Sequence, residues 1–147
     1  MRQSPVVQIG RSARKVETAL NHILEEEEVT LFEALLLTAL FFEKKGVKPS
    51  ALAEVFETTR GNVSHGVSSL EAKGLVKRRV DPGDARALQI MLLPQGRRRA
   101  VRVAGILDRM QRQLEQMAGV KEIQTMIRQL DLMELYCGAM AHADWPK

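Results

Sequence analysis

Hydrophobic residues recur every three or four positions over residues 5–45, a spacing typical of α-helices. Thr30 and Glu33 have the spacing of a capping box, so a helix is predicted from Leu31 to about Lys45, before Gly46. Ten of the twelve residues at 31–42 are apolar, which predicts a helix buried on most sides. An amphipathic helix is predicted before it, over residues 5–25, with an apolar face of Val16, Ala19, Leu20, Ile23 and Leu24.

Two shorter helices are predicted over residues 50–57 and 60–73. Ser50 follows a proline and is expected to cap the first. Thr58 or Thr59 separates the two helices and caps the second, which ends at Gly74 because glycine tolerates the left-handed conformation. Helices with so short a connection must cross steeply, as they do in a helix-turn-helix.

The hydrophobic period shortens to about two after Gly74, which is typical of β-strands. Strand-like runs at 75–80 and 88–93 predict a hairpin with residues 81–87 as its tip. Pro82 and Gly83 favour a turn, and Asp81 and Asp84 can accept hydrogen bonds from nearby backbone N–H groups. Arg86 is therefore expected to project from a rigid hairpin.

Two further helices are predicted towards the C-terminus, and their apolar surface exceeds what the short helices and the hairpin can cover. Pro94-Gln95-Gly96 begins the first, whose stripe alternates spacings of four and three: Val103, Leu107, Met110, Leu114 and Met117. After Gly119, a last helix to about Met140 carries Val120, Ile123, Met126, Ile127, Leu130, Met133 and Cys137. A symmetric homodimer built from residues 5–25 and 95–141 would bury these faces.

The helix at 60–73 has one apolar and one polar side. Val63, Val67 and Leu70 form a stripe that is expected to face the core. The opposite side is small, polar and uncharged except near its ends, at Arg60 and Lys73. Short polar side chains on such a face can meet base edges in a DNA major groove, which admits a helix. The outer residues are Gly61, Asn62, Ser64, His65, Ser68, Ser69 and Ala72.

Positive charge is concentrated in one part of the chain. The net charge is +4, yet residues 60–112 hold twelve lysines and arginines against four acidic residues. Such a patch is typical of a protein that binds a phosphate backbone. The length of 147 residues is enough for one domain with a real core, and 45% hydrophobic residues are ordinary for a globular protein.

Several of these motifs together resemble the MarR family of winged helix-turn-helix regulators. They are Asn62-Val63-Ser64, the junction Leu70-Glu71-Ala72-Lys73-Gly74-Leu75-Val76, and the wing Asp84-Ala85-Arg86. The resemblance covers nearly the whole chain. It implies a mostly α-helical single domain over 1–147, with a winged helix-turn-helix at 30–93, that binds a near-palindromic operator as a homodimer, as a repressor. His65 departs from the arginine that many members carry, so a base preference does not carry over.

Under this resemblance, Asn62, Ser64, His65, Ser68 and Ser69 are expected to face the major groove. Arg60 and Lys73 are expected to contact phosphates, as is Arg79, whereas strand alternation places Arg78 on the other side. Arg86, supported by Asp84, is the family's minor-groove arginine; the alternative is an ion pair between them. Arg97, Arg98, Arg99 and Arg102 either reach phosphates, which we slightly favour, or pair with acids of the first helix.

No other chemistry has a comparable pattern in the sequence. Glycine-rich phosphate loops and motifs of catalytic residues are lacking, so an enzyme is not expected, nor a cofactor. His22, His65 and His142 lie far apart, and the acidic run at 25–28 is interpreted as a solvated helix end, so no metal is expected. Cys137 is expected to be a buried hydrophobe rather than a redox sensor.

The sequence also bears on the location and the regulation of the protein. The apolar run at 6–10 is too short for a secretion signal, and a membrane span is not expected, which favours the cytoplasm. The resemblance implies a small phenolic or anionic effector, with His22, Phe41 and Phe42 as candidate contacts. Two alternatives stay open: a winged-helix module that docks proteins, and a nonspecific chromosomal DNA-binding protein without an operator.

Overall fold

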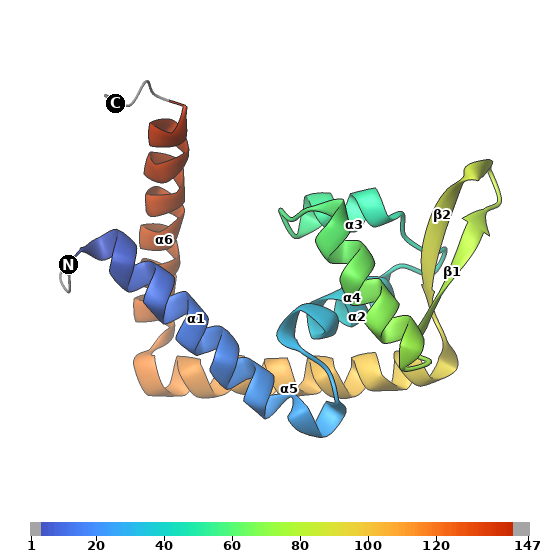
Figure 1. Cartoon of the computed structure of the whole chain (residues 1–147). Coiled ribbons are helices and arrows are strands. Elements are labelled where there is room, and N and C mark those ends of the chain that lie inside the picture. Colours follow the sequence, from blue (N-terminus) through green and yellow to red (C-terminus); the bar gives the residue numbers. More distant parts are fainter. Residues whose placement is uncertain (1–3, 143–147) are drawn as a thin grey trace. The chain divides into compact units, whose positions relative to one another are not determined.

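The computed structural model describes residues 4–142, which form a mostly helical chain with one antiparallel hairpin, as predicted (Figure 1). Two compact units are present, one within residues 1–106 and one within 107–147. Helix α5 has residues in both units. The elements are α1 (Pro5–Ile23), a 3-10 turn η1 (Glu25–Glu27), α2 (Leu31–Phe42), α3 (Pro49–Val55), α4 (Arg60–Ala72), β1 (Val76–Asp81), β2 (Asp84–Leu92), α5 (Pro94–Ala118) and α6 (Val120–Ala141).

Helix α2 lies in the core of the first unit. Its N-terminus has the predicted capping box: the Thr30 hydroxyl accepts from the Glu33 backbone N–H, and the Glu33 carboxylate accepts from that of Thr30. The helix ends at Phe42, earlier than predicted. Its residues are buried or half-buried up to Phe41, as predicted, and only Phe42, at the end, is exposed, at 73%. The chain leaves the helix early because Val47 must reach the sheet, where it exchanges two backbone hydrogen bonds with Ile90.

Helices α3 and α4 form the predicted helix-turn-helix. Pro49, rather than a residue after Ser50, is the first residue of α3, and Lys48 is its N-cap. The prediction of Ser50 as the cap was wrong because proline needs no hydrogen-bond partner for its nitrogen and fits the first helical position. Of the two threonines that the sequence left open as caps of α4, Thr59 is the one that accepts a hydrogen bond from the Asn62 backbone N–H.

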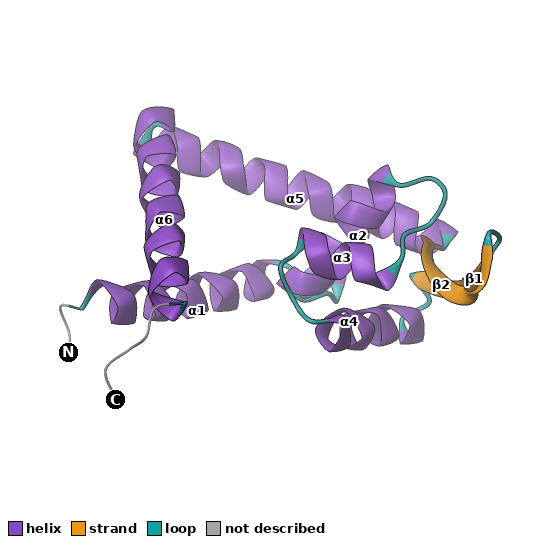
Figure 2. Cartoon of the chain, turned by 90° about the horizontal axis from the view of Figure 1, so that it is seen from above, coloured by secondary structure: helices purple, strands orange, loops and turns teal. Residues whose placement is uncertain are grey.

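The predicted core stripe of α4 is buried against the other helices. Val63, Val67 and Leu70 have no exposed surface. Phe32 of α2 meets Phe56, which follows α3, edge to face with ring centroids 5.9 Å apart. Burial of this stripe turns the opposite side of α4 outward, where Figure 2 shows the helix at the edge of its unit.

The hairpin has a longer second strand and a shorter tip than predicted, whereas its first strand has the predicted length. Strands β1 and β2 continue to a two-residue turn at Pro82-Gly83. Val80 pairs with Leu88 but Asp81 pairs with Asp84, so residues 85–87 form a bulge in β2. The seven-residue tip was wrong because the carboxylates of Asp81 and Asp84 accept from the backbone N–H groups of Gly83 and Arg86, which lets the strands pair almost to the turn.

The hairpin is fastened to the start of α5 by close backbone packing. Leu75, just before β1, accepts a backbone hydrogen bond from Leu93, just before α5. Gly96 then lies so close that a Cβ atom there would be 1.8 Å from the Leu75 carbonyl oxygen. Only a residue without a side chain fits at this position.

The helices proposed for dimerisation leave apolar side chains uncovered. Neither α1 nor α6 has a buried residue. Exposed apolar side chains on α6 include Ile127, Leu130, Leu135 and Tyr136, and Met117 at the end of α5 is 86% exposed. Cys137 is exposed as well, so its predicted burial was wrong for a single chain, because nothing packs on this side of α6 among the described residues.

We expect Gly96→Ala to reduce the free energy of unfolding by about 3 kcal/mol, because the new methyl group meets backbone that cannot move aside without disturbing the hairpin. The neighbouring Gln95→Ala, at an exposed helical position, should change it by less than about 0.5 kcal/mol. Urea unfolding at equal protein concentration measures both. Equal stability of the two variants would contradict the close approach at Gly96.

Candidate nucleic-acid interface

The outer side of α4 presents a continuous row of exposed polar residues. Arg60, Asn62, Ser64, His65 and Ser68 are all exposed, as the sequence predicts. Each lies away from the buried stripe, so none is needed for the core. The helix is therefore able to offer this side to a partner without unfolding.

The first turn of α4 has a defined orientation for one of these side chains. The Asn62 Nδ2 atom donates to the Thr58 hydroxyl at 3.0 Å, while its backbone N–H donates to Thr59 at 3.1 Å. The amide oxygen of Asn62 makes no hydrogen bond within residues 4–142. It is available as an acceptor at the N-terminal end of the row.

A guanidinium from the hairpin lies on the same side of α4, which the sequence did not indicate. Arg78 of β1 donates from Nη2 to the Ser64 carbonyl oxygen at 3.1 Å and to the Ser68 hydroxyl at 3.0 Å. Its Nη1 atom donates to the Glu71 carboxylate, which also accepts from the Arg78 backbone N–H. The alternation of side chains along the strand predicted that Arg78 lies on the opposite side from Lys77 and Arg79. It did not predict that this side contacts α4.

Two predicted DNA contacts, at Lys73 and Ser69, are engaged by a carboxylate of the chain itself. The Lys73 ammonium donates to the Glu33 carboxylate and to the Glu28 carbonyl oxygen, both at 2.8 Å, and therefore does not extend towards a phosphate. Ser69 is half-buried and hydrogen-bonds to Glu33 as well. The sequence did not indicate either contact, because the buried carboxylate that requires these donors becomes their neighbour only in the folded chain.

Glu33 is the one buried charged residue among those described, with 4% of its surface exposed. Burial by itself would raise its pKa. The hydrogen bonds from Lys73, Ser69 and the Thr30 backbone, together with the charge of Lys73, outweigh burial and lower the pKa below its ordinary value. Glu33 is therefore ionised and paired at neutral pH.

Arg79, also predicted to contact DNA, is held by its own unit. Its Nη2 atom donates to the Lys45 carbonyl oxygen at 2.9 Å and to the Gln89 side chain at 3.1 Å. The side chain is half-buried and links Lys45, in the segment before α3, to Gln89 of the hairpin. This contact corrects the assignment of Arg79 as a phosphate contact.

The wing tip presents Arg86 to solvent. Its backbone N–H donates to Asp84 at 3.0 Å, but within residues 4–142 its guanidinium forms no hydrogen bond or ion pair. The alternative of an Arg86–Asp84 ion pair is therefore not observed. Asp84 acts on the backbone, and its neighbour Asp81 accepts from Gly83, a contact that lowers the pKa of Asp81 despite slight desolvation.

The arginines at the start of α5 are mostly paired. Arg99 and Arg102 bind the Glu27 carboxylate at 3.2 and 2.9 Å, and Arg97 lies 5.2 Å from the ring centroid of Phe41. The preference for phosphate contacts was therefore wrong for Arg99 and Arg102, because the 3-10 turn directs Glu27 at them. The acidic run at 25–28 was interpreted as a solvated helix end, but Glu27 within it forms these ion pairs with α5.

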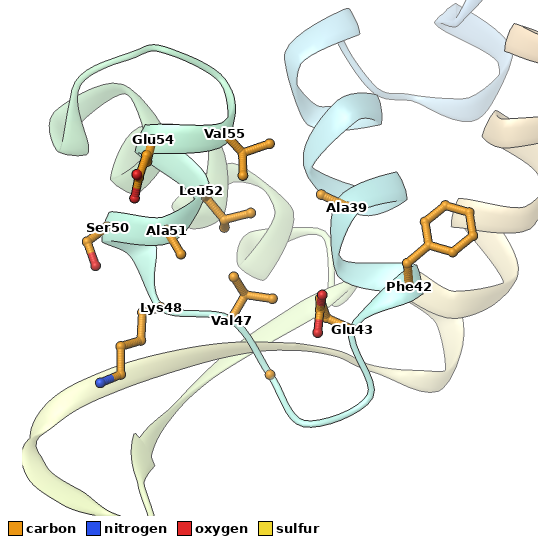
Figure 3. Close-up of a pocket in the computed structure, with 11 residues that line it drawn as sticks. Ala39, Phe42, Glu43, Val47, Lys48, Ser50, Ala51, Leu52, Glu54 and Val55 are labelled. Carbon is orange, nitrogen blue, oxygen red and sulfur yellow. The ribbon is translucent and has the colours of Figure 1, made fainter.

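One hollow adjoins α2 and α3, and Figure 3 shows its lining. It encloses about 560 Å³. Val47, Leu52 and Val55 point into it, whereas the Phe42 ring points away. Of the three residues suggested for an effector, only Phe42 lies at this hollow, and His22 and Phe41 do not.

Residues 4–142 contain neither a membrane-spanning helix nor a metal-binding cluster. The helices described there include none that is both long and apolar enough to cross a bilayer. No group of three or more His, Cys, Asp or Glu residues in this part of the chain is arranged to hold a metal ion.

Residues 29–87 match the sequence model of the MarR family. The structure is similar to the S. aureus MepR–DNA complex, with a TM-score of 0.81 and 22% identity over 90% of this chain and 98% of that one. It is also similar to the transcriptional regulator BldR from Sulfolobus solfataricus, with a TM-score of 0.72 and 22% identity over 89% and 92% of the chains. The reduced form of MarR from E. coli has a TM-score of 0.68 and 19% identity over 88% and 96%. No curated protein sequence matches the chain.

These likenesses confirm the resemblance carried by the motifs and the winged helix-turn-helix fold class. The matched segment, residues 29–87, contains the polar row of α4 and the exposed Arg86.

We expect Lys73→Met to reduce the free energy of unfolding by about 3 kcal/mol at pH 7, because it leaves the Glu33 charge buried without its partner. Since the folded-state pKa of Glu33 lies below the ordinary 4.5, the stability that the pair provides is present above that pH and is lost as the pH falls through the folded-state pKa. The difference between variant and wild type should therefore shrink at pH 4. Urea unfolding at the two pH values, with the exposed Lys77→Met as control, measures it; a loss independent of pH would contradict the pairing.

Proposed function

We propose that this chain, with the fold and, over residues 29–87, the sequence pattern of the MarR family, is a DNA-binding transcriptional regulator that recognises a near-palindromic operator as a homodimer and represses transcription. The proposal is carried by two features of one unit. The polar face of α4 is exposed, and Arg86 on the rigid hairpin is exposed with a guanidinium that forms no hydrogen bond or ion pair within residues 4–142. A helix and a wing presented by one unit suit two neighbouring grooves of a duplex.

In the proposed complex, α4 enters the major groove. Asn62, Ser64, His65 and Ser68 face base edges, because their side chains are short, polar and exposed. Arg60 at the start of α4 contacts a phosphate, where its charge adds to the positive end of the helix. Arg86 enters the adjacent minor groove, whose negative potential attracts a guanidinium when the groove is narrow.

The homodimer is proposed from the apolar side chains that one chain leaves uncovered. Helices α1 and α6 have no buried residue, although both carry apolar stripes. A second copy can cover these surfaces by twofold symmetry, in which the same patch serves both chains. Two α4 helices would then address half-sites about 34 Å apart, one turn of DNA.

Regulation of this binding is proposed on the family resemblance. A dimer bound across a promoter blocks transcription, and a small phenolic or anionic effector that prefers a DNA-free conformation would release it. The alternative of a protein-docking module is not favoured by the exposed Arg86, since a docking surface has no need of a cation at the wing tip. The alternative of a nonspecific DNA-binding protein predicts uniform affinity for all sequences.

We expect Arg86→Ala to weaken operator binding by about 1–3 kcal/mol. Arg60→Ala should weaken binding to all sequences alike and lower the slope of log affinity against log salt by about one. Lys121→Ala, which removes an equal charge from α6, should change neither. Fluorescence anisotropy across salt concentrations measures these effects. The docking would be wrong if Arg86→Ala and His65→Ala both left operator affinity unchanged.

We expect Ile127→Asp to shift the protein from dimer to monomer, because a carboxylate replaces an apolar side chain in the proposed interface on α6. Gln129→Asp, an exposed polar position on the same helix, should leave the dimer intact. Sedimentation velocity over a range of concentrations distinguishes the two. A dimer of unchanged affinity in the Ile127 variant would place the interface elsewhere.

A further inference from the structure

Arg78 is positioned to control what one side chain of α4 can read. Its side chain is only 25% exposed, and its Nη2 atom uses both N–H groups on α4, one on the Ser64 carbonyl oxygen and one on the Ser68 hydroxyl. Its Nη1 atom is paired with Glu71. The guanidinium is thus immobilised against the face that the proposed function directs into the major groove.

These contacts decide which way the Ser68 hydroxyl donates. A serine within a helix commonly turns its O–H back to the carbonyl four residues earlier, which for Ser68 is that of Ser64. That oxygen already accepts the helical bond from the Ser68 backbone N–H, and Arg78 occupies its second lone pair. The Ser68 oxygen itself also accepts from Arg78. The Ser68 O–H is therefore left to point outward as a donor.

An outward donor distinguishes the bases. In the major groove, guanine, adenine and thymine each present an acceptor, whereas cytosine presents only its N4 amino donor. An O–H donor facing cytosine would meet another donor, and a buried polar group without a partner costs binding energy. Ser68 should therefore accept any of three bases and reject the fourth.

We infer that Arg78 is a specificity-determining residue that acts through Ser68, holding its hydroxyl as a donor so that the regulator rejects cytosine at the base facing Ser68. Arg78 is a positioning residue, because it need not touch DNA. The inference rests on the proposed function, since it requires α4 to lie in the major groove. The Glu71 pairing favours this role over a phosphate contact, because it already neutralises the Arg78 charge.

The Arg78 guanidinium also connects α4 to the hairpin that carries Arg86. Glu71 in the last turn of α4 accepts from both the backbone and the side chain of Arg78 in β1. Arg86 is carried by the partner strand, β2. The distance between the base read by Ser68 and the groove entered by Arg86 is thereby held constant.

The test is selection of bound sequences from a randomised operator library, followed by affinity measurements on the selected site and on single-base variants. The full chain is used as wild type, Arg78→Met, Arg78→Lys and Ser68→Ala. We expect wild type to exclude cytosine at one position of each half-site, by roughly tenfold in affinity. Arg78→Met and Ser68→Ala should each lose that exclusion at that position only.

Arg78→Lys separates charge from positioning. Lysine keeps the positive charge beside Glu71 but cannot donate in the fixed planar geometry that reaches both Ser64 and Ser68. We expect it to accept cytosine as Arg78→Met does. The double variant Arg78→Met/Ser68→Ala should bind no worse to the preferred site than the weaker single variant, because the two residues act as one unit.

Controls separate this role from a structural or phosphate role. A phosphate contact would lower the salt slope by about one in Arg78→Met, and we expect no change. If Arg78→Met does not fold, as judged by thermal unfolding, Ser68→Ala still decides, because an exposed serine is dispensable for folding. If Ser68→Ala, or a folded Arg78→Met, still excludes cytosine, the inference about Arg78 is wrong, whereas the proposed function is unaffected. A wild-type chain that selects no sequence would overturn the proposed function with it.

Discussion

The rotation of α4 about its own axis depends on the ion pair between Lys73 and the buried carboxylate of Glu33. A carboxylate inside the protein must be hydrogen-bonded, and Glu33 obtains its donors from the Thr30 backbone, Ser69 and Lys73. Two of these donors lie in the last turns of α4. A helix that turned by one residue would leave the carboxylate with too few partners, so the face opposite Glu33 is always the one presented to solvent.

That face is also restrained from outside. Arg78 bridges Ser64, Ser68 and Glu71, so the hairpin cannot swing away from α4 without breaking hydrogen bonds to a charged group. The Glu33 pair sets the direction of the helix face, and the Arg78 contacts set the position of the wing beside it. The proposed binding to two DNA grooves needs both, because α4 and the wing must fit their grooves at the same time.

The sequence predicted the helices and strands better than it predicted where they end and how long the turns between them are. Helices α2, α4 and α5 have strong hydrophobic periods or clear caps, and their starts were predicted at Leu31, at about Arg60 and at Pro94. The end of α2 was missed because it is set by pairing of Val47 with Ile90, residues far apart in the chain. The length of the tip was missed because it depends on two aspartate–backbone hydrogen bonds rather than on hydrophobicity.

The exposure of several candidate site residues was predicted for a similar reason, whereas the intramolecular contacts of the others were not. Exposure of Asn62, His65 and Arg86 follows from local pattern, since each lies opposite an apolar stripe or at a turn. Arg79 and Lys73 have the positive charge that a contact with phosphate requires. Their partners within the chain, the Lys45 carbonyl and Glu33, become their neighbours only in the folded chain. A count of charges along the sequence cannot separate a cation that holds the fold from one that is available to a ligand.

This distinction changes what the proposed function predicts for the basic segment. Residues 60–112 hold twelve cations, but those at Lys73, Arg78, Arg99, Arg102 and Arg112 are paired with carboxylates of the chain itself. In the proposed complex, a cation already paired within the chain would release no counterion from the duplex, so nonspecific affinity should be weaker than the formal charge suggests. Weak nonspecific binding increases the ratio of operator to background affinity, provided that base contacts supply the difference. The paired arginines therefore favour discrimination between sequences over tight binding to any of them.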